Sequence, residues 1–329
     1  MTGGHLSTPL IAAVVAFALA VAFVRALCSD RLATLVLDIP NDRSLHSRPV
    51  PRTGGVGLML AAAVTLLLFS GNPRSIVLPA LLLAVIFLVD DIRGLPVLPR
   101  FLAQFAAAIA FLAMSGPHAW WLLPALALGI VWSVNLYNFM DGSNGFAGGM
   151  TVAGFATYAI AAAAAGDHQL AMLSAAIAGA GAGFLVWNFD PARIFLGDAG
   201  SIPVGFMAAA IGVLGWDHGI WPFWFPGLVF SVFIVDSGLT LAKRLIHREN
   251  PFQAHRSHYY QRLIRMGWSH CRLALSAYAL MAATCLSALV LREASFAMSL
   301  VGLVLWATIF AALALAIDRR WRASPIRGT

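Results

Sequence analysis

The chain alternates between long apolar stretches and short polar gaps, and this alternation predicts a bundle of membrane-spanning helices. A spanning helix needs about 20 mostly apolar residues. We therefore expect an all-α, polytopic integral membrane protein with about 10–11 transmembrane helices. The expected spans are Leu6–Cys28, Gly55–Ser70, Ser75–Val89, Phe101–Ser115, Trp120–Leu136, Phe146–Ala165, Gln169–Trp187, Ser201–Trp216, Trp221–Ala242, Leu273–Leu291 and Phe296–Ile317.

Composition excludes a soluble globular protein, because hydrophobic residues make up 60% of the 329 residues and charged residues only 11%. The first apolar segment has no basic region before it, so we expect a retained span rather than a removed signal peptide. Cys28, Cys271 and Cys285 show no metal-binding or redox spacing. No repeat or soluble segment is visible, and a single transmembrane domain over residues 1–329 is expected.

The basic residues predict the orientation. If successive spans cross in alternate directions, 19 of the 21 Lys and Arg residues fall on one side, and only Arg74 and Arg292 fall on the other. The richer side is cytoplasmic by the positive-inside rule, which places the N-terminus outside and the C-terminus in the cytoplasm. The net charge of +7 follows from this distribution. It indicates contact with anionic membrane lipid and not with nucleic acid.

Most of the residues able to do chemistry lie in the predicted cytoplasmic loops, at about residues 29–54, 90–100, 136–146, 188–200 and 243–272. The opposite loops are too short to hold a site. A cluster of ionisable side chains at one membrane surface indicates function, because such groups are costly there unless they are solvated or paired.

Two of these loops carry cations that suit a phosphate group. The first holds Arg43, His46 and Arg52 among three prolines and a Gly-Gly pair, which exclude a regular helix through it. The fifth loop interleaves arginines with two histidines; its candidates are His255, Arg256 and His258. A zinc site is the alternative for the histidines, but no Cys or His-Glu-x-x-His pattern accompanies them.

Carboxylates mark three further positions. Asp90 and Asp91 end an apolar helix, where an acidic residue opposes the helix dipole, so a role as base, water ligand or metal ligand is favoured. Asp198 starts a span and is equally readable as a helix N-cap or as a ligand of a divalent cation. Asp236 lies within the ninth apolar segment, where it is a functional candidate or a simple partner of Lys243 or Arg244.

The third and fourth loops combine amides with small residues. Asn135, Asn138 and Asp141 share one side if helical, and packing does not explain these polar groups beside the glycines. Asn188 and Phe195 lie in the fourth loop, just before Asp198.

Taken together, the five loops resemble the bacterial polyprenyl-phosphate N-acetylhexosamine-1-phosphate transferases (glycosyltransferase 4 type). This superfamily includes the O-antigen-initiating enzymes and phospho-N-acetylmuramoyl-pentapeptide transferase. The resemblance covers about Asp38 to Leu263. It rests on Arg43/His46 with Pro-Arg52-Thr-Gly-Gly, Asp90-Asp91, Asn135-x-x-Asn138-x-x-Asp141-Gly, Phe195-Leu-Gly-Asp198-x-Gly-Ser and the His255/His258 loop.

The resemblance implies an enzyme of the bacterial inner membrane with its active site facing the cytoplasm. Undecaprenyl phosphate would attack the sugar-linked phosphorus of a UDP-N-acetylhexosamine, UMP would leave, and a lipid diphosphate-sugar would form. Such phosphoryl transfer needs positioning and charge stabilisation by a divalent cation. The implied cofactor is Mg²⁺, with Mn²⁺ as an alternative, and a homodimer is left open.

The resemblance also implies individual roles. Asp198 would ligand the metal, Asp91 would support the metal or the base, and Asp90 would accept a proton from the lipid phosphate or otherwise assist attack. Contacts to the nucleotide would come from Asn138, Asp141 and Asn188, with Phe195 stacking on uracil. The diphosphate would be bound by His255, Arg256 and His258, and the lipid phosphate would be faced by Arg43, His46 and Arg52.

The chain departs from the cell-wall pentapeptide enzyme at several positions, which favours the branch that initiates O-antigen or related surface glycans. Gly94 stands where many members carry a third acidic residue, and Asn144 replaces an Asp. The pentapeptide transferase is the alternative within the superfamily. A secondary transporter is the alternative from another class, although transporters place ionisable residues near the bilayer midplane. A scaffold that kept the fold and lost activity is a third.

Overall fold

The computed structural model describes residues 4–34, 36–40, 48–69, 74–116, 118–250 and 255–324. Within these residues the helices are α1 Gly4–Leu27, α2 Asp30–Ala33, α3 Gly54–Leu68, α4 Arg74–Arg93, α5 Val97–Met114, α6 Leu123–Phe139, α7 Phe146–Ala164, α8 His168–Asn188, α9 Asp198–Asp217, α10 Phe225–Val229, α11 Ser231–Ile246, α12 Tyr259–Arg265, α13 His270–Arg292 and α14 Phe296–Ala323. Two strands, β1 Leu37–Asp38 and β2 Val50–Pro51, pair in antiparallel register.

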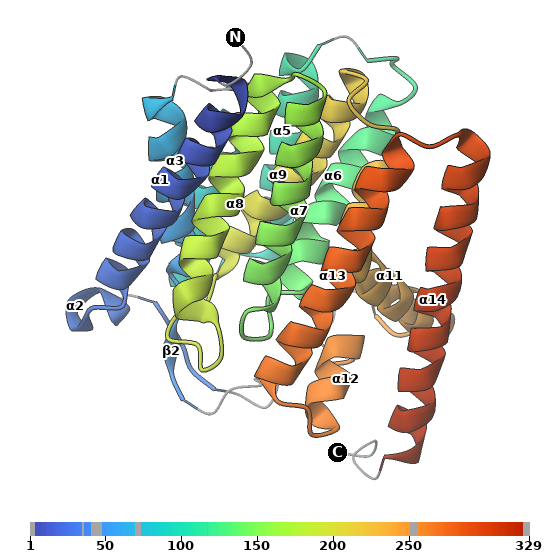
Figure 1. Cartoon of the computed structure of the whole chain (residues 1–329). Coiled ribbons are helices and arrows are strands. Elements are labelled where there is room, and N and C mark those ends of the chain that lie inside the picture. Colours follow the sequence, from blue (N-terminus) through green and yellow to red (C-terminus); the bar gives the residue numbers. More distant parts are fainter. Residues whose placement is uncertain are drawn as a thin grey trace.

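The expectation of an all-α, polytopic membrane protein is confirmed. In the described part of the chain, α1, α4, α5, α7, α8, α9, α13 and α14 are long and apolar enough to cross a membrane, and α3 and α6 are shorter apolar helices. These helices run side by side between two ends of the molecule (Figure 1). The strands, α12 and the C-terminal end of α14 lie at one end, and α1 begins at the other.

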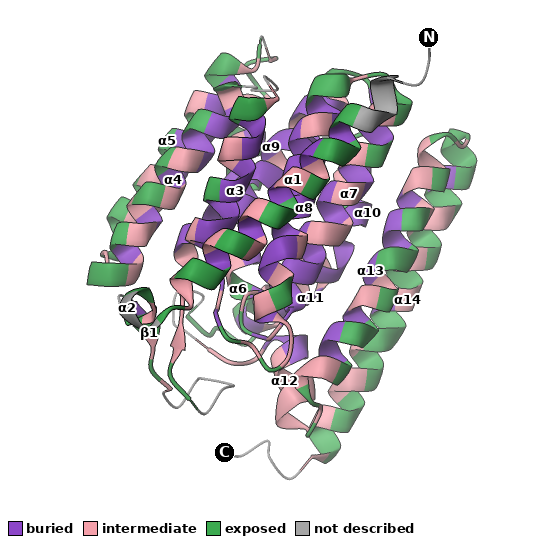
Figure 2. Ribbon diagram, turned by 60° about the vertical axis from the view of Figure 1, so that its left-hand side comes forward, coloured by how far each residue is buried: buried purple, intermediate pink, exposed green. Residues whose placement is uncertain are grey.

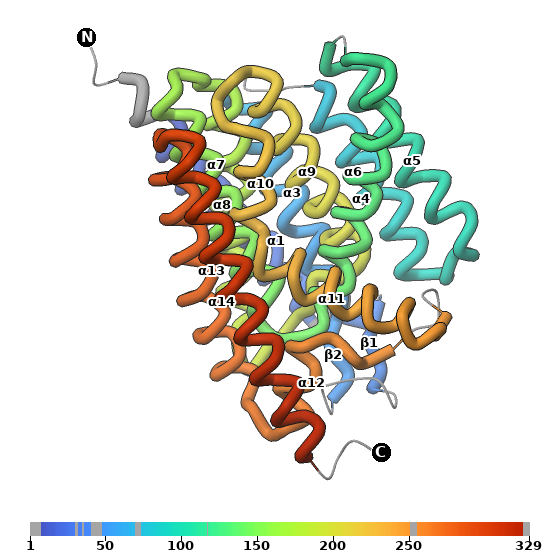
Figure 3. The backbone as a smooth tube through the Cα atoms, turned by 90° about the vertical axis from the view of Figure 1, so that its right-hand side faces the viewer, coloured from blue at the N-terminus to red at the C-terminus, as the bar shows by residue number. Residues whose placement is uncertain are grey.

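The expectation of a single span over Trp221–Ala242 is wrong. The structure divides this segment at Phe230 into the short α10 and the longer α11, and α11 turns away from the axis of the bundle (Figure 3). The buried face of α11 carries Asp236, Ser237 and Thr240. These polar groups would be costly against lipid tails, so the turn places them against other protein segments at the end of the bundle.

The centre of the bundle is built on small residues. α8 packs between α1 and α7, and Gly179 and Gly183 of α8 are four residues apart on the face toward α1. A Cβ added at these positions would lie 2.1 Å from the carbonyl oxygen of Ala13 and 2.5 Å from that of Phe17. Glycine therefore lets the two helix backbones approach closely, as small residues at four-residue spacing do in membrane helices.

The outer surface is apolar, as a lipid environment requires. Buried residues gather in the middle of the bundle and exposed ones on its periphery (Figure 2). Helix α14 lies at the edge and buries only Ser299 and Phe310. Trp120 and Trp121 are exposed at the end of the bundle opposite the strands, where tryptophan suits a membrane interface.

A substitution at Gly55 tests the backbone contact between the start of α3 and the start of α9. An added Cβ at Gly55 would lie 2.2 Å from the Cα of Gly200, so Gly55→Ala must force the two segments apart. We expect a loss of about 1–3 kcal/mol, as for other overpacked sites, measured as a lower unfolding temperature in detergent. Gly129→Ala in α6 is the matched control, because its Cβ would meet nothing within 4 Å. Equal unfolding temperatures for the two variants would contradict the assignment.

Candidate active site

The first loop reaches the site through a short β-ribbon. β1 and β2 pair Leu37 with Pro51 and Asp38 with Val50, and the chain then enters α3 directly after Arg52. The predicted absence of a regular helix around these prolines is confirmed for the residues that the structure describes. The predicted phosphate ligands Arg43 and His46 lie outside the described residues.

Main-chain hydrogen bonds join this ribbon to the fourth loop. Phe195 donates from its backbone N–H to the carbonyl of Pro51 (2.7 Å), and the N–H groups of Gly54 and Gly55 donate to the carbonyls of Phe195 (2.9 Å) and Leu196 (2.8 Å). The first and fourth loops, more than 140 residues apart, are thereby held side by side. This contact brings Arg52 next to Asp198.

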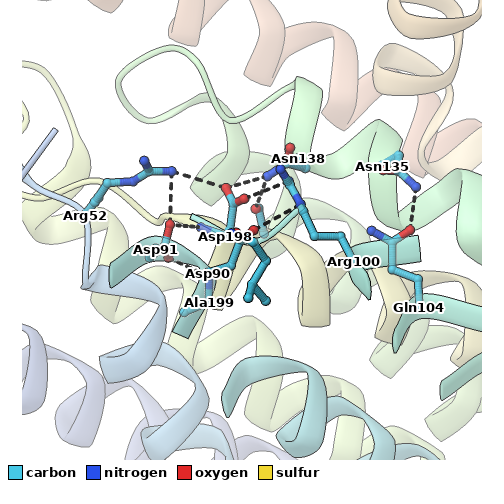
Figure 4. A network of polar contacts seen from close by, with 11 residues as sticks. Arg52, Asp90, Asp91, Arg100, Gln104, Asn135, Asn138, Asp198 and Ala199 are labelled. Carbon is cyan, nitrogen blue, oxygen red and sulfur yellow. Dashed lines mark hydrogen bonds and ion pairs between the residues drawn. The ribbon is translucent and has the colours of Figure 1, made fainter. Parts of the chain in front are cut away.

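Asp198, the first residue of α9, lies at the centre of a polar network (Figure 4). Its Oδ1 accepts from the Nδ2 of Asn138 (2.8 Å) and from the Nη2 of Arg52 (3.3 Å). Its Oδ2 accepts from the Nη2 of Arg100 (3.0 Å). The N-cap position of α9 is Gly197 and not Asp198, so the side chain of Asp198 faces the network instead of its own helix.

The two adjacent carboxylates at the end of α4 have different partners. Asp91 accepts from the backbone N–H groups of Asp198 (3.3 Å) and Ala199 (3.0 Å), which are the first free N–H groups of α9, and its Oδ1 also lies 3.1 Å from the Nη2 of Arg52. Asp90 pairs through Oδ2 with the Nε of Arg100 (3.0 Å). Both side chains are nearly inaccessible to solvent, at 5% for Asp90 and 1% for Asp91.

Sequence reasoning missed Arg100, which was counted only as a topological anchor. It stands in the first turn of α5, where a cation opposes the helix dipole. That unfavourable position was the available signal, because neighbouring acidic groups would offset its cost. The structure supplies them in Asp90 and Asp198.

Sequence reasoning identified Asn135 but missed the amide side chain to which it is hydrogen-bonded. Gln104 of α5 is 1% exposed, and its Oε1 accepts from the Nδ2 of Asn135 of α6 (2.7 Å; Figure 4). Asn135 donates further to the carbonyl of Val131 (2.8 Å). This pair joins α5 to α6 one helical turn beyond Arg100.

The third loop adds a further acidic group. The backbone N–H of Gly197 donates to Asp141, yet burial, followed by the negative charge of Asp198, holds the pKa of the Asp141 carboxyl well above its usual range. We call Asp90, Asp91, Asp141 and Asp198, with Arg52, Arg100 and Asn138, the acidic centre. Its four carboxyl groups face two guanidinium groups, so the centre has an excess of one negative charge with Asp141 protonated and of two with all four ionised.

The other two predicted nucleotide contacts, Asn188 and Phe195, belong to the fourth loop. Asn188 is buried; its Oδ1 accepts from the N–H of Gly145 (3.0 Å) and its Nδ2 donates to the carbonyl of Ile194 (2.9 Å). Its amide therefore joins the third loop to the fourth, and its contact with a nucleotide stays a prediction. Phe195 is half-buried on the same loop as Asp198.

The described part of the histidine loop, from His255 to His258, meets the segment that carries Asn138 at Phe139. His255 and Arg256 are half-buried, and His258 is buried next to α12. Tyr260 of α12 donates from its hydroxyl to the carbonyl of Phe139 (3.1 Å), the residue after Asn138. Burial and the neighbouring His258, Arg244 and Arg262 lower the pKa of His255 to about 4, so this imidazole is neutral at pH 7.

The acidic centre suits a divalent cation that is shared with a substrate. Within the described residues, no group of three or more His, Cys, Asp or Glu side chains is arranged to hold a metal by itself. Mg²⁺, however, commonly takes one or two carboxylates and completes its shell with water and substrate phosphates. The excess of negative charge and the oxygen-only donor set of Asp198, Asp91 and Asn138 fit such an ion.

The fold and the acidic centre define a polytopic membrane protein with a charged site at one end of an apolar bundle. Residues 73–215 match glycosyl transferase family 4. The chain therefore carries a glycosyl transferase family 4 domain, which includes Asp90, Asp91, Asn138 and Asp198.

Similar proteins extend over more of the chain. It is 28% identical over 285 residues to a probable undecaprenyl-phosphate N-acetylglucosaminyl 1-phosphate transferase of Bacillus subtilis, which covers 80% of this chain and 79% of that protein. It is 28% identical to decaprenyl-phosphate N-acetylglucosaminephosphotransferase of Mycolicibacterium smegmatis, over 73% of this chain and 71% of that protein. It is 32% identical to phospho-N-acetylmuramoyl-pentapeptide-transferase of Latilactobacillus sakei, but over only 45% and 46% of the two chains.

The raised pKa of Asp141 predicts a pH-dependent cost to stability. Its ionised form is disfavoured in the folded protein, so the cost is absent below the unfolded-state pKa of about 4 and grows as pH rises toward the folded-state pKa. Asp141→Asn removes this cost, and we expect its unfolding temperature relative to the natural protein to increase with pH. Thermal unfolding in chelator from pH 4 to 9 measures this; a difference that stays constant or shrinks with rising pH would contradict it.

Proposed function

We propose that this chain is a phosphoglycosyltransferase that transfers an N-acetylhexosamine 1-phosphate from a UDP-sugar to undecaprenyl phosphate. The bond between the sugar-linked phosphorus and the UMP oxygen breaks, and a new bond to an oxygen of the lipid phosphate forms. The products are UMP and undecaprenyl-diphosphate-sugar. The observation that carries the proposal is the acidic centre, whose excess negative charge lies where an apolar bundle meets water.

The position of this centre suits two substrates of opposite solubility. A polyprenyl chain is soluble only in the lipid bilayer, and a nucleotide sugar is soluble only in water. The acidic centre lies at the end of the bundle that carries the β-ribbon and α12 (Figures 1 and 4). The two phosphate groups can therefore meet there without either substrate leaving its own phase.

Phosphoryl transfer needs alignment of phosphate groups and neutralisation of their charge more than covalent chemistry by the protein. Arg52 and Arg100 supply guanidinium groups on opposite sides of Asp198, and guanidinium binds phosphate in two-pronged geometry. A bound Mg²⁺ would neutralise the diphosphate and hold the leaving group. Asn138 orients the carboxylate of Asp198 by its 2.8 Å hydrogen bond.

The three carboxylates are suited to different tasks. Asp198 is the favoured metal ligand, because its oxygens are held by side chains and not by backbone groups. Asp91 is held by two backbone N–H groups of α9 and therefore supports the position of Asp198. Asp90 is assigned to assist attack by the lipid phosphate, either as proton acceptor or within a covalent route.

The donor is proposed to be a UDP-N-acetylhexosamine without a peptide, used in making O-antigen or a related surface glycan. Two relatives named for N-acetylglucosamine transfer align over 80% and 73% of the chain, whereas the pentapeptide transferase aligns over 45%. UDP-N-acetylglucosamine is thus the first donor to test. The proposed location is the bacterial inner membrane with the acidic centre facing the cytoplasm, because the basic residues gather on that side.

UMP release by the purified protein tests the proposal. We expect release that requires both undecaprenyl phosphate and Mg²⁺, is abolished by chelator, and is supported by UDP-N-acetylglucosamine or another UDP-N-acetylhexosamine. Asp198→Asn should lower turnover by about two orders of magnitude or more while the protein stays folded, because a charged ligand is lost at the reacting phosphates. Substantial turnover in Asp198→Asn would refute the metal assignment, and lipid-independent release would refute the transferase.

Arg100→Gln tests how the charge of the acidic centre affects metal binding and the rate of UMP release. Removing this cation leaves Asp90 and Asp198 without their shared partner, so the centre becomes more negative. We expect tighter binding of Mn²⁺, measured by electron paramagnetic resonance without substrate, together with slower UMP release.

Arg93→Gln is the matched control, because Arg93 is exposed at the end of α4 in the same region of the chain. Its Mn²⁺ affinity and turnover should equal those of the natural protein. Weaker Mn²⁺ binding in Arg100→Gln than in Arg93→Gln would show that the cation does not bind at Asp198.

A further inference from the structure

A buried carboxylate outside the acidic centre has partners that the sequence did not suggest. The sequence left Asp236 of α11 either as a functional candidate or as a partner of Lys243 or Arg244. Lys243 pairs with Asp318 of α14, and Arg244 lies against Glu249. Asp236 itself is 8% exposed and points toward the start of α12.

The carboxylate of Asp236 receives donors from the end of the histidine loop. Its two oxygens accept separately from the backbone N–H groups of Tyr259 and Tyr260, both at 2.9 Å. The Nδ1 of His258 lies 3.2 Å from Oδ1, and the hydroxyl of Thr240 donates to the same oxygen at 3.4 Å. The Asp236 side chain therefore fixes both the backbone at Tyr259 and Tyr260 and the imidazole of His258.

This contact determines which nitrogen of His258 carries the proton. A carboxylate only accepts hydrogen bonds, so the Nδ1 that faces it must be protonated. The Nε2 of His258 is then the nitrogen left for a ligand. Fixing one imidazole nitrogen by a carboxylate in order to orient the other is a general way of preparing histidine for function.

The neighbouring His255 has the opposite tautomer. Its Nδ1 accepts from the backbone N–H of Ser257 (3.4 Å) and lies 2.8 Å from the Ser257 hydroxyl, so its single proton is on Nε2. The two rings lie 4.9 Å apart. His255 thus offers a neutral N–H donor, and His258 offers a nitrogen whose state is governed by Asp236.

His258 is also linked to the acidic centre by packing. Its ring lies 5.9 Å from that of Phe139, and Phe139 follows Asn138, which donates to Asp198. Gly142 leaves room for this arrangement, because a Cβ there would lie 2.1 Å from the hydroxyl oxygen of Tyr260. The histidine loop therefore rests on the same segment that carries the amide of the acidic centre.

We propose that Asp236 is a positioning residue that fixes the ring and the tautomer of His258, so that the unprotonated Nε2 is presented as a hydrogen-bond acceptor to a donor group of the substrate. This inference rests on the proposed function for the identity of the ligand. The assignment of the tautomer does not, since it follows from contacts within the chain.

Asp318 provides a matched control for the removal of a carboxylate next to α12. It accepts from the Nη1 of Arg262 (2.9 Å) and from the hydroxyl of Tyr259 (3.4 Å), and it pairs with Lys243. It therefore holds α12 from the side of α14, without contact to His258 among the described interactions. A loss that comes only from loosening α12 should be equal in variants of Asp236 and Asp318.

The test compares Asp236→Asn, Asp236→Glu and Asp318→Asn in the full-length protein. Nitrogen NMR of protein labelled with ¹⁵N-histidine, without substrate, reports which ring nitrogen is protonated, and His258→Gln assigns the signal. We expect a protonated Nδ1 at His258 in the natural protein, in Asp236→Glu and in Asp318→Asn. In Asp236→Asn the side-chain amide can donate to Nδ1, and the proton should move wholly or partly to Nε2.

Kinetics supply the second measurement. Asp236→Asn should lower kcat for UMP release by about 10- to 100-fold, the range for carboxylates that orient functional histidines. Its KM for the donor should change less, Asp236→Glu should recover part of kcat, and Asp318→Asn should remain within about twofold of the natural protein. An unchanged tautomer in Asp236→Asn, or equal losses of kcat in Asp236→Asn and Asp318→Asn, would overturn the proposal. Absence of UMP release from the natural protein would refute the proposed function alone, because the tautomer is measured without turnover.

Discussion

The structure depends on holding several carboxylates of like charge close together at the end of an apolar bundle. Asp90, Asp91, Asp141 and Asp198 repel one another, and burial makes that repulsion stronger than it would be in water. Arg52 and Arg100 each bridge two of these carboxylates, and backbone N–H groups at the start of α9 supply further positive dipole. The first loop, α4, α5 and α9 meet at one place because these contacts offset the repulsion.

This arrangement links stability to function. Several carboxylates held close together attract cations, but their mutual repulsion costs stability when no cation is bound. The pKa of Asp141 is raised because burial and the charge of Asp198 disfavour its ionised form, and this is one part of that cost. The tight packing elsewhere, such as the contact of α1 with Gly179 and Gly183 of α8, supplies the stability against which this cost is set.

Much of this organisation was predictable from the sequence. Spans follow from hydropathy, and alternation along the chain assigns Asp90, Asp91, Asn138 and Asp198 to one side of the membrane. The structure brings these four residues together with Arg52 (Figure 4). Their chemical roles and the metal stay predictions, whereas the shared location follows from a one-dimensional pattern because a membrane leaves only two sides to choose from.

The remaining features depend on tertiary contacts that hydropathy does not contain. An arginine that anchors a helix and Arg100, which bridges two carboxylates, look alike in a sequence. The break at Phe230 falls between apolar residues, and the sequence does not show that Asp236 finds its partners at the start of α12. The hydrogen bonds of Asn188 to backbone groups of two loops are likewise absent from any one-dimensional pattern.

The main-chain attachment of the β-ribbon to the fourth loop bears on how such a site diversifies over evolutionary time. Its hydrogen bonds are made by backbone atoms at Pro51, Gly54, Phe195 and Leu196, so they do not depend on which side chains the first loop displays. Replacements in that loop leave the spacing between Arg52 and Asp198 intact as long as Gly55 and Gly200 stay small. Substitutions at the ribbon's exposed positions can thus accumulate while the spacing between Arg52 and Asp198 is inherited unchanged.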